Sequence, residues 1–203
     1  MSGYPVFLAA DRIAALVVGA GAVGTRKALG LLESGASVRV VAPDIGAELR
    51  ERAAYDDALS LVERAYESAD ADDATLVVAA TGSRAVNARI AHDALARRRL
   101  VNVADAPAEG NFVTAATHRA GELVIAITAG GVPAAATRVR DSLAGRFDRR
   151  YAEAVSALAA LRREALRTGG AAAWRRAADA LIGDDFCASV ESGTFDERVA
   201  AWR

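Results

Sequence analysis

Three glycines at fixed spacing follow directly on a run of apolar residues near the start of this 203-residue chain. The run is Ala15 to Val18, and Gly19, Gly21 and Gly24 form the pattern G-x-G-x-x-G before a segment of helical periodicity. In such an arrangement the glycines permit a tight turn, the approach of a diphosphate, and close packing of helix on strand. The pattern therefore predicts an α/β, Rossmann-type sheet, and it favours dinucleotide binding over a glycine-rich turn that binds nothing.

The remainder of the first 113 residues alternates between short apolar runs and helical segments. Strands are expected at 15–18, 37–42, 59–62, 76–80 and 100–103, and helices at 23–34, 45–54 and 84–98. Strands that alternate with helices build a parallel sheet covered on both faces. We therefore expect an N-terminal domain over residues 1–113.

The pattern changes after the fifth strand. A hairpin is expected from two strands at 112–115 and 123–128, and Gly130, Gly131 and Pro133 open a helix. From residue 148 onward only helices are expected, over 151–168 and 171–182, with a glycine pair between them. These segments predict a small region at 114–147 and a helical C-terminal domain at 148–203.

Charge and cysteine content narrow the class of protein. The 25 basic residues against 26 acidic ones leave a net charge of -1, so no global field attracts nucleic acid or an anionic membrane. The sequence contains no run of about 18 apolar residues, so no transmembrane helix is predicted. Cys187 is the single cysteine, which excludes an internal disulfide and predicts a reducing, cytoplasmic compartment. The cysteine and histidine positions predict no metal site.

Polar residues follow the strands at the edge where an open α/β sheet binds its ligands. Asp44 comes shortly after the second strand and is the candidate for the ribose hydroxyls, while no arginine just after that strand is available for a 2′-phosphate. NAD is therefore favoured over NADP. Thr81 follows the fourth strand, and Asp105 follows the fifth, among apolar neighbours expected to shield it partly. From position alone, Asp105 fits a catalytic carboxylate and a turn cap equally well.

Several segments together resemble one family. They are PVFL at 5–8, LVVGAGAVGTRKALGLLESGASVRVVAP at 16–43, VVAATG at 77–82, NVADAP at 102–107, and NF at 111–112. This combination resembles the precorrin-2 dehydrogenase family, which includes the dehydrogenase/ferrochelatases and the N-terminal module of siroheme synthase. The resemblance covers roughly residues 3–145.

The resemblance implies an oxidoreductase of siroheme biosynthesis that oxidises precorrin-2, a tetrapyrrole, to sirohydrochlorin with NAD. It also implies a homodimer with its dimerisation region near 114–147, and a helical part that helps to enclose the tetrapyrrole. By motif match, the cofactor contacts fall at Ala22, Val23, Pro43 and Asp44, and the catalytic aspartate falls at Asp105. Whether the chain also inserts Fe²⁺ stays open.

An arginine-rich block extends over residues 138–176, with ten arginines against four acidic residues. The block fits a solvated helical face, and it also fits a site for an acidic ligand such as a tetrapyrrole with its carboxylates. Gly130, Gly131, Arg138 and Arg140 are the candidate substrate residues. The alternative function is an NAD(H)-sensing regulatory module without catalysis, which has no need of the NVADAP segment or of the arginine block.

Overall fold

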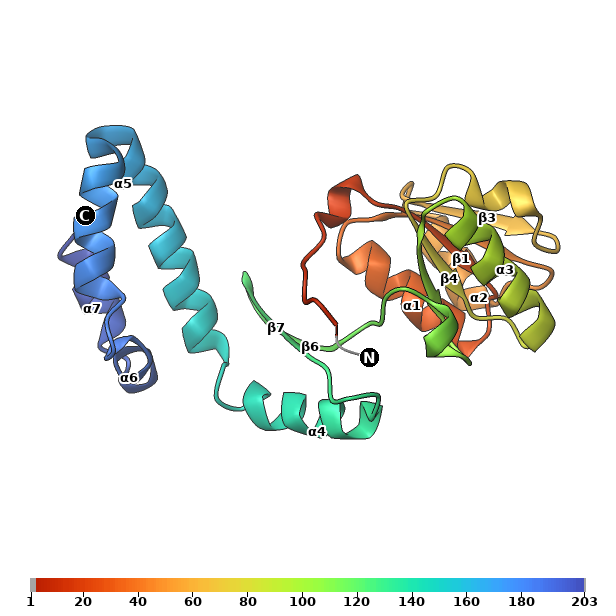
Figure 1. Ribbon diagram of the computed structural model, residues 1–203. Coiled ribbons are helices and arrows are strands. Elements are labelled where there is room, and N and C mark those ends of the chain that lie inside the picture. The colour runs from red at the N-terminus through yellow and green to blue at the C-terminus, as the bar shows by residue number, and fades with distance from the viewer. Residues whose placement is uncertain (1–2, 203) are drawn as a thin grey trace. The chain divides into compact units, whose positions relative to one another are not determined.

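The computed structural model describes residues 3–202, and the chain divides into two compact units between Thr114 and Ala115 (Figure 1). We call them the N-terminal unit and the C-terminal unit.

The N-terminal unit is built on one five-stranded sheet in which every pairing is parallel and the strand order is β3-β2-β1-β4-β5. Its strands are β1 (Ala14–Val18), β2 (Ser37–Ala42), β3 (Leu59–Glu63), β4 (Leu76–Ala79) and β5 (Leu100–Val103). Its helices are α1 (Ala22–Glu33), α2 (Ala47–Ala53) and α3 (Arg84–Ala96), with short 3₁₀ turns η1 (Ala10–Arg12), η2 (Ser68–Ala71) and η3 (Pro107–Glu109). The predicted Rossmann-type sheet is confirmed.

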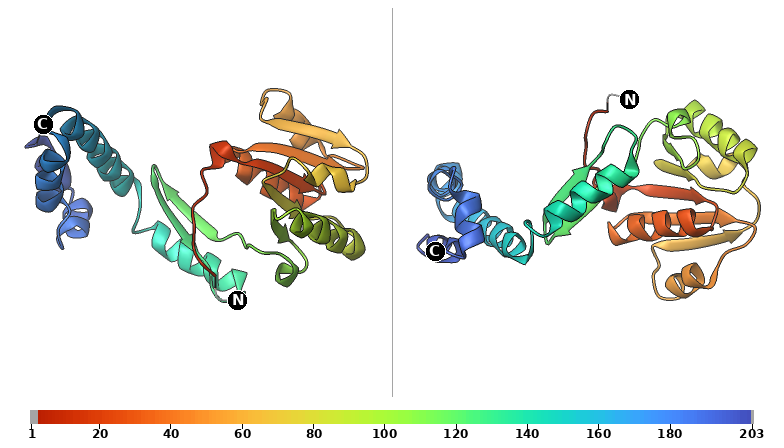
Figure 2. Two further views of the ribbon diagram at one scale, coloured as in Figure 1. Left: turned by 45° about the horizontal axis from the view of Figure 1, so that its top comes forward. Right: turned by 90° about the horizontal axis from the view of Figure 1, so that it is seen from below.

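Both faces of this sheet are buried, as its near-continuous apolar strands predict. Alternate residues of the strands pack with Ala28 and Leu32 of α1 and Leu49 of α2 on one face. The intervening residues pack with Ile90 and Ala94 of α3 on the other face. The helices thereby form two layers around the sheet (Figure 2).

The register aligns the carboxyl ends of four strands. Val18 of β1 pairs with Val41 of β2 and Ala79 of β4, and Ala79 pairs with Val103 of β5. The segments that follow β1, β2, β4 and β5 therefore leave the sheet at one edge, and the strand order reverses direction between β1 and β4. Such a switch point is where open α/β sheets bind ligands.

The outer edge of β5 is covered by the segment that follows η3. Asn111 accepts a hydrogen bond from the Val101 backbone N–H (2.7 Å) and donates one to the Arg99 carbonyl (2.9 Å). Gly110 passes so close that an added Cβ would lie 2.5 Å from the Val101 oxygen. The Asn111 and Phe112 backbone N–H groups both donate to the Val101 carbonyl as well. The expected strand at 112–115 is therefore wrong, because the chain is held at the sheet edge by these few bonds around Val101 and not by a strand ladder.

The C-terminal unit begins with a hairpin of β6 (Ala116–Ala120) and β7 (Leu123–Ile127), which are antiparallel. Helix α4 (Pro133–Ala144) packs against both strands (Figure 2). Its first turn contains Pro133, whose fixed φ suits a helix start.

A long helical segment, α5 (Arg149–Leu181), is broken at Gly170, where φ is 66° and ψ is -163°. This region of backbone space is essentially restricted to glycine. Two short helices follow, α6 (Phe186–Ser192) and α7 (Phe195–Ala200), and the Phe186 and Phe195 rings meet edge to face with centroids 5.1 Å apart. The Phe186 ring also meets that of Tyr151 on α5, with centroids 6.4 Å apart, so aromatic contacts join the short helices to each other and to α5.

Within residues 3–202, no helix is long and apolar enough to cross a membrane.

Candidate dinucleotide and catalytic site

The glycine loop between β1 and α1 needs two of its three glycines for the fold itself. Gly19 has φ of 101°, and an added Cβ would lie 2.4 Å from the Ala80 oxygen. A Cβ on Gly24 would lie 1.9 Å from the Gly19 oxygen. These residues allow the turn and the close approach of α1 to β1 and β4.

Gly21 has no comparable reason to be glycine. Its φ is -72°, which every residue adopts, and an added Cβ would meet nothing within 4 Å. It is the N-cap of α1 with no side-chain cap, so backbone N–H groups of the first turn are left for a ligand. An open cradle at a helix N-terminus fits a diphosphate, because the free N–H groups and the helix dipole both favour an anion.

The remaining predicted cofactor residues lie around this loop. Ala22 and Val23 form the first turn of α1, and Val23 is exposed. Pro43 and Asp44 directly follow β2 and are also exposed. The Gly19 backbone N–H donates to the Val41 carbonyl (2.9 Å), which holds the glycine loop against the end of β2.

Thr81 and Asp105 follow β4 and β5, and the buried amide of Asn87 joins them. The Thr81 backbone N–H and hydroxyl both donate to Asn87 Oδ1, at 3.0 and 2.7 Å. Asn87 Nδ2 donates to the Thr81 carbonyl (3.1 Å) and to Asp105 Oδ1 (3.0 Å). Two predicted site residues from neighbouring strands are therefore bound to one side chain.

Asp105 itself is exposed, so the expected shielding by its apolar neighbours is wrong. The Ala104 N–H donates to the Ala79 carbonyl (2.9 Å), which continues the β4–β5 ladder up to Asp105. Arg84 at the start of α3 pairs with Glu109 of η3 and ties down the turn beyond it. The carboxylate thus stands in solvent on a well-supported turn.

Sequence reasoning did not identify Asn87. A signal was present, because Asn87 lies on the same helical stripe as the buried residues Ile90, Ala91 and Ala94. A polar residue on an otherwise apolar stripe indicates a buried hydrogen-bonding role. Asn87 is only 1% exposed.

The candidate substrate residues belong to the C-terminal unit. Gly130 and Gly131 lie before α4 with φ of 55° and 86°, a conformation that favours glycine. Arg138 and Arg140 lie on α4, where Arg140 is bound to Asp141 and Arg138 has no partner among the described residues.

Half of the arginines in the arginine-rich block already form ion pairs with acidic residues. Within residues 3–202, ion pairs join Arg140 to Asp141, Arg146 to Glu191, Arg149 to Glu153, Arg150 to Asp148, and Arg167 to Glu164. In the same part of the chain the arginines without an ion pair are Arg138, Arg162, Arg163, Arg175 and Arg176. The block is therefore in part a solvated, paired helical surface.

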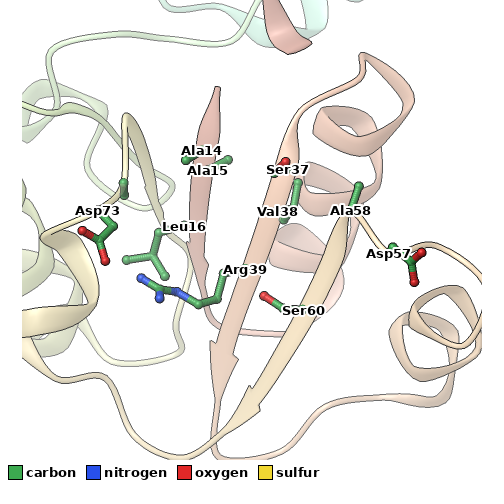
Figure 3. A pocket seen from close by; sticks show the side chains of 11 residues that line it. Ala14, Ala15, Leu16, Ser37, Val38, Arg39, Asp57, Ala58, Ser60 and Asp73 are labelled. Carbon is green, nitrogen blue, oxygen red and sulfur yellow. The ribbon is translucent and has the colours of Figure 1, made fainter. Parts of the chain in front are cut away.

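A cavity of about 250 Å³ lies at the opposite edge of the sheet (Figure 3). Ala14, Ser37 and Ala58 line it from the amino ends of three strands, together with the Arg39 side chain. Arg39 donates to the Asp70 carbonyl (2.6 Å). None of the predicted site residues lines this cavity.

Among the described residues, no three His, Cys, Asp or Glu side chains gather closely enough to hold a metal ion.

Comparisons with known proteins agree with this fold. Residues 6–116 match a family described as "Putative NAD(P)-binding". The chain is 40% identical over 131 residues to a siroheme synthase of Ectopseudomonas mendocina, covering 64% of this chain and 28% of the relative. It is 38% identical over 154 residues to that of Pseudomonas entomophila, covering 75% and 33%. The chain spans about a third or less of these curated relatives.

The fold also matches a solved structure, "SirC, precorrin-2 dehydrogenase", with a TM-score of 0.79 and 27% identity over 98% of this chain and 100% of that one. Sequence and structure comparisons thus agree with the resemblance seen in the motifs. The chain belongs to the NAD(P)-binding family, as a relative of precorrin-2 dehydrogenase and of the N-terminal module of siroheme synthase.

Proposed function

We propose that this chain is an NAD-dependent dehydrogenase that oxidises precorrin-2 to sirohydrochlorin. The observation that carries the proposal is Asp105, an exposed carboxylate held by Asn87 at the carboxyl edge of the sheet that also bears the glycine loop. A dinucleotide cradle and a fixed carboxylate at one sheet edge are what a dehydrogenation requires. A sensor module has no use for the carboxylate.

Gly21, Ala22 and Val23 would bind the diphosphate, with Gly19 and Gly24 shaping the loop, and Pro43, Asp44 and Thr81 would complete the cofactor site. The cation beside Asp44 is Arg50, which is bound to the Ile45 carbonyl and paired with Glu63. Arg39 lies at the other edge of the sheet. Neither is free for a 2′-phosphate, which supports NAD over NADP.

The reaction removes two hydrogens from the macrocycle, one as a hydride and one as a proton. NAD, held by the glycine loop, would supply the hydride acceptor. Asp105 would accept the proton from the macrocycle and release it to solvent, to which this carboxylate is open. Precorrin-2 and NAD thus give sirohydrochlorin, NADH and one proton.

Asp105→Asn tests the catalytic assignment. Because the amide has nearly the shape of the carboxylate but cannot accept the proton, kcat should fall by about 10² or more. NAD affinity should be nearly unchanged. The measurement is NADH absorbance at 340 nm with precorrin-2 and NAD, alongside NAD titration of both proteins.

Two outcomes of this assay contradict the proposal. Turnover of Asp105→Asn at the wild-type rate would reduce Asp105 to a turn residue. Tight NAD binding by the wild-type chain without any NADH formation would favour the NAD(H)-sensing module. Adding Fe²⁺ to the sirohydrochlorin formed, with and without the chain, tests ferrochelation separately.

We further propose that residues 114–147 form the interface of a homodimer. The apolar residues Leu123, Val124 and Ile125 of the hairpin are only half-buried, and Val139 on α4 is 47% exposed. Apolar surface left open in this way is typical of association sites. Light scattering of the purified chain, which should give twice the mass of one chain, tests this assembly.

A further inference from the structure

Asn87 is a buried polar residue that the proposed reaction does not yet use. It lies in the first turns of α3, four residues after the N-cap Ser83, and is 1% exposed. A buried amide is stable only when its polar atoms are hydrogen-bonded. Its partners therefore define what it does.

The backbone of Thr81 fixes which way the Asn87 amide points. An N–H group can only donate, so the Asn87 atom that faces the Thr81 N–H is the oxygen. The NH₂ group must then face the Thr81 carbonyl and Asp105 Oδ1. Both lone pairs and both protons of the amide are used, and no rotated arrangement satisfies them equally.

The consequence falls on Asp105. One carboxylate oxygen, Oδ1, accepts the Asn87 hydrogen bond at 3.0 Å. The other oxygen, Oδ2, has no partner within residues 3–202. A carboxylate on an exposed turn would otherwise rotate freely, so the bond to Asn87 selects the oxygen that remains open and the direction it faces.

We propose that Asn87 is a positioning residue that holds Asp105 through Oδ1 and leaves Oδ2 as the proton-accepting oxygen. This inference rests on the proposed dehydrogenase function. It adds that the buried first turns of α3, and not only the exposed turn after β5, determine the rate of the proton-transfer step.

A double-mutant cycle on kcat tests the proposal. Asn87→Ala should lower kcat by about tenfold, the scale of one hydrogen bond to a charged group. In an Asp105→Ala background the same change should cost no more than about twofold, because the carboxylate it positions is gone. If Asn87→Ala lowers kcat in the Asp105→Ala background by as much as it does in the wild type, the proposal is overturned.

Two further variants separate positioning from general damage. Asn87→Asp keeps an oxygen toward the Thr81 N–H but removes the NH₂ group that donates to the Thr81 carbonyl and to Asp105, so kcat should still fall. Asn111→Ala is the matched control, because Asn111 binds only backbone atoms of the sheet edge. It should be less stable than the wild type, with kcat within about twofold of it at temperatures where it is folded.

An NMR measurement needs neither turnover nor a change at residue 87. The side-chain amide proton of Asn87 that faces Asp105 should move upfield in Asp105→Ala and stay in place in Asp44→Ala. An unmoved resonance in Asp105→Ala would overturn the positioning role. If the wild-type chain makes no NADH but the resonance moves, the proposed function fails while the Asn87–Asp105 coupling stands.

Discussion

Gly21 differs from the other two glycines of its motif in what surrounds it. Gly19 is required by its left-handed φ, and both Gly19 and Gly24 are required by backbone atoms closer than 3 Å to an added Cβ, whereas Gly21 has neither constraint. The fold alone would accept a larger residue there. A ligand that approaches the helix N-terminus would not.

Gly21→Leu should therefore abolish NAD binding and leave the fold intact. The side chain would fill the open space at the N-terminus of α1, and nothing in the chain lies within 4 Å of its Cβ. Calorimetric titration with NAD and a thermal melt are the two measurements. Gly24→Ala is the control for the fold: its added Cβ would collide with the Gly19 carbonyl oxygen, so this variant should be less stable. Unchanged NAD affinity in Gly21→Leu would contradict the assigned cradle.

Lys27 is the chain's single lysine, and its surroundings lower its pKa. Burial is the larger cause and the neighbouring charge of Arg26 the smaller one; the ammonium donates to Thr114 Oγ1 at 3.1 Å. The unfolded chain thus binds this proton more tightly, and stability should rise with pH between the lowered pKa and the ordinary value of 10.5.

Reductive ¹³C-methylation gives one lysine resonance whose titration can be followed directly. Its midpoint should lie below 10.5, and the matching rise in stability should be missing in Lys27→Met. A midpoint at or above 10.5 would show that the side chain is solvated rather than half-buried.

At the scale of elements, the parallel sheet could be predicted because each strand is a short, largely apolar run and the runs alternate with helical segments. Helices α6 and α7 could not, since they are too short for a helical period and depend on the packing of Phe186 and Phe195. The segment at 112–115 resembles a strand in sequence because most of its residues are apolar, yet it lies along the edge of β5. Asn87 was missed for a related reason, because its role depends on residues from two strands that only the fold brings to it.

Asn111→Ala should show how much the segment that covers the edge of β5 contributes to the stability of the fold. It removes one hydrogen bond to the Val101 N–H and one to the Arg99 carbonyl, so the free energy of unfolding should fall by about 1–3 kcal/mol. Urea denaturation measures this change. Asn111→Asp keeps the acceptor and loses the donor, and should lie between the two proteins. If the free energy of unfolding falls no more than it does for a substitution on the exposed surface, water replaces the hydrogen bonds of the Asn111 side chain.

Over the whole molecule, positive charge is concentrated in residues 138–176, although the net charge is only -1. Five of the ten arginines there are neutralised by ion pairs, and Arg138 is among those that are not. An unpaired arginine that follows the glycine pair before α4 is the stronger candidate for a substrate carboxylate.

Arg138→Ala should raise the apparent KM for precorrin-2 more than that for NAD, because removing a charge-assisted contact weakens only the ligand it touches. Arg140→Ala should act in the same direction but less strongly, since Arg140 is already bound to Asp141. Arg149→Ala, which breaks a pair with Glu153, is the matched control. Equal effects on both KM values would argue against substrate recognition by α4.

The break at Gly170 has a practical use for following this protein. The helical segment turns back at this non-helical residue (Figure 1), and an added Cβ on Gly170 would meet nothing within 4 Å. Gly169 and Ala171 on either side of it are exposed. Turns of this kind accept inserted residues, because the backbone on either side is held by its own helix. A short tag or fluorophore-bearing peptide inserted after Gly170 would report on the helical segment and leave the dinucleotide-binding sheet free of any label.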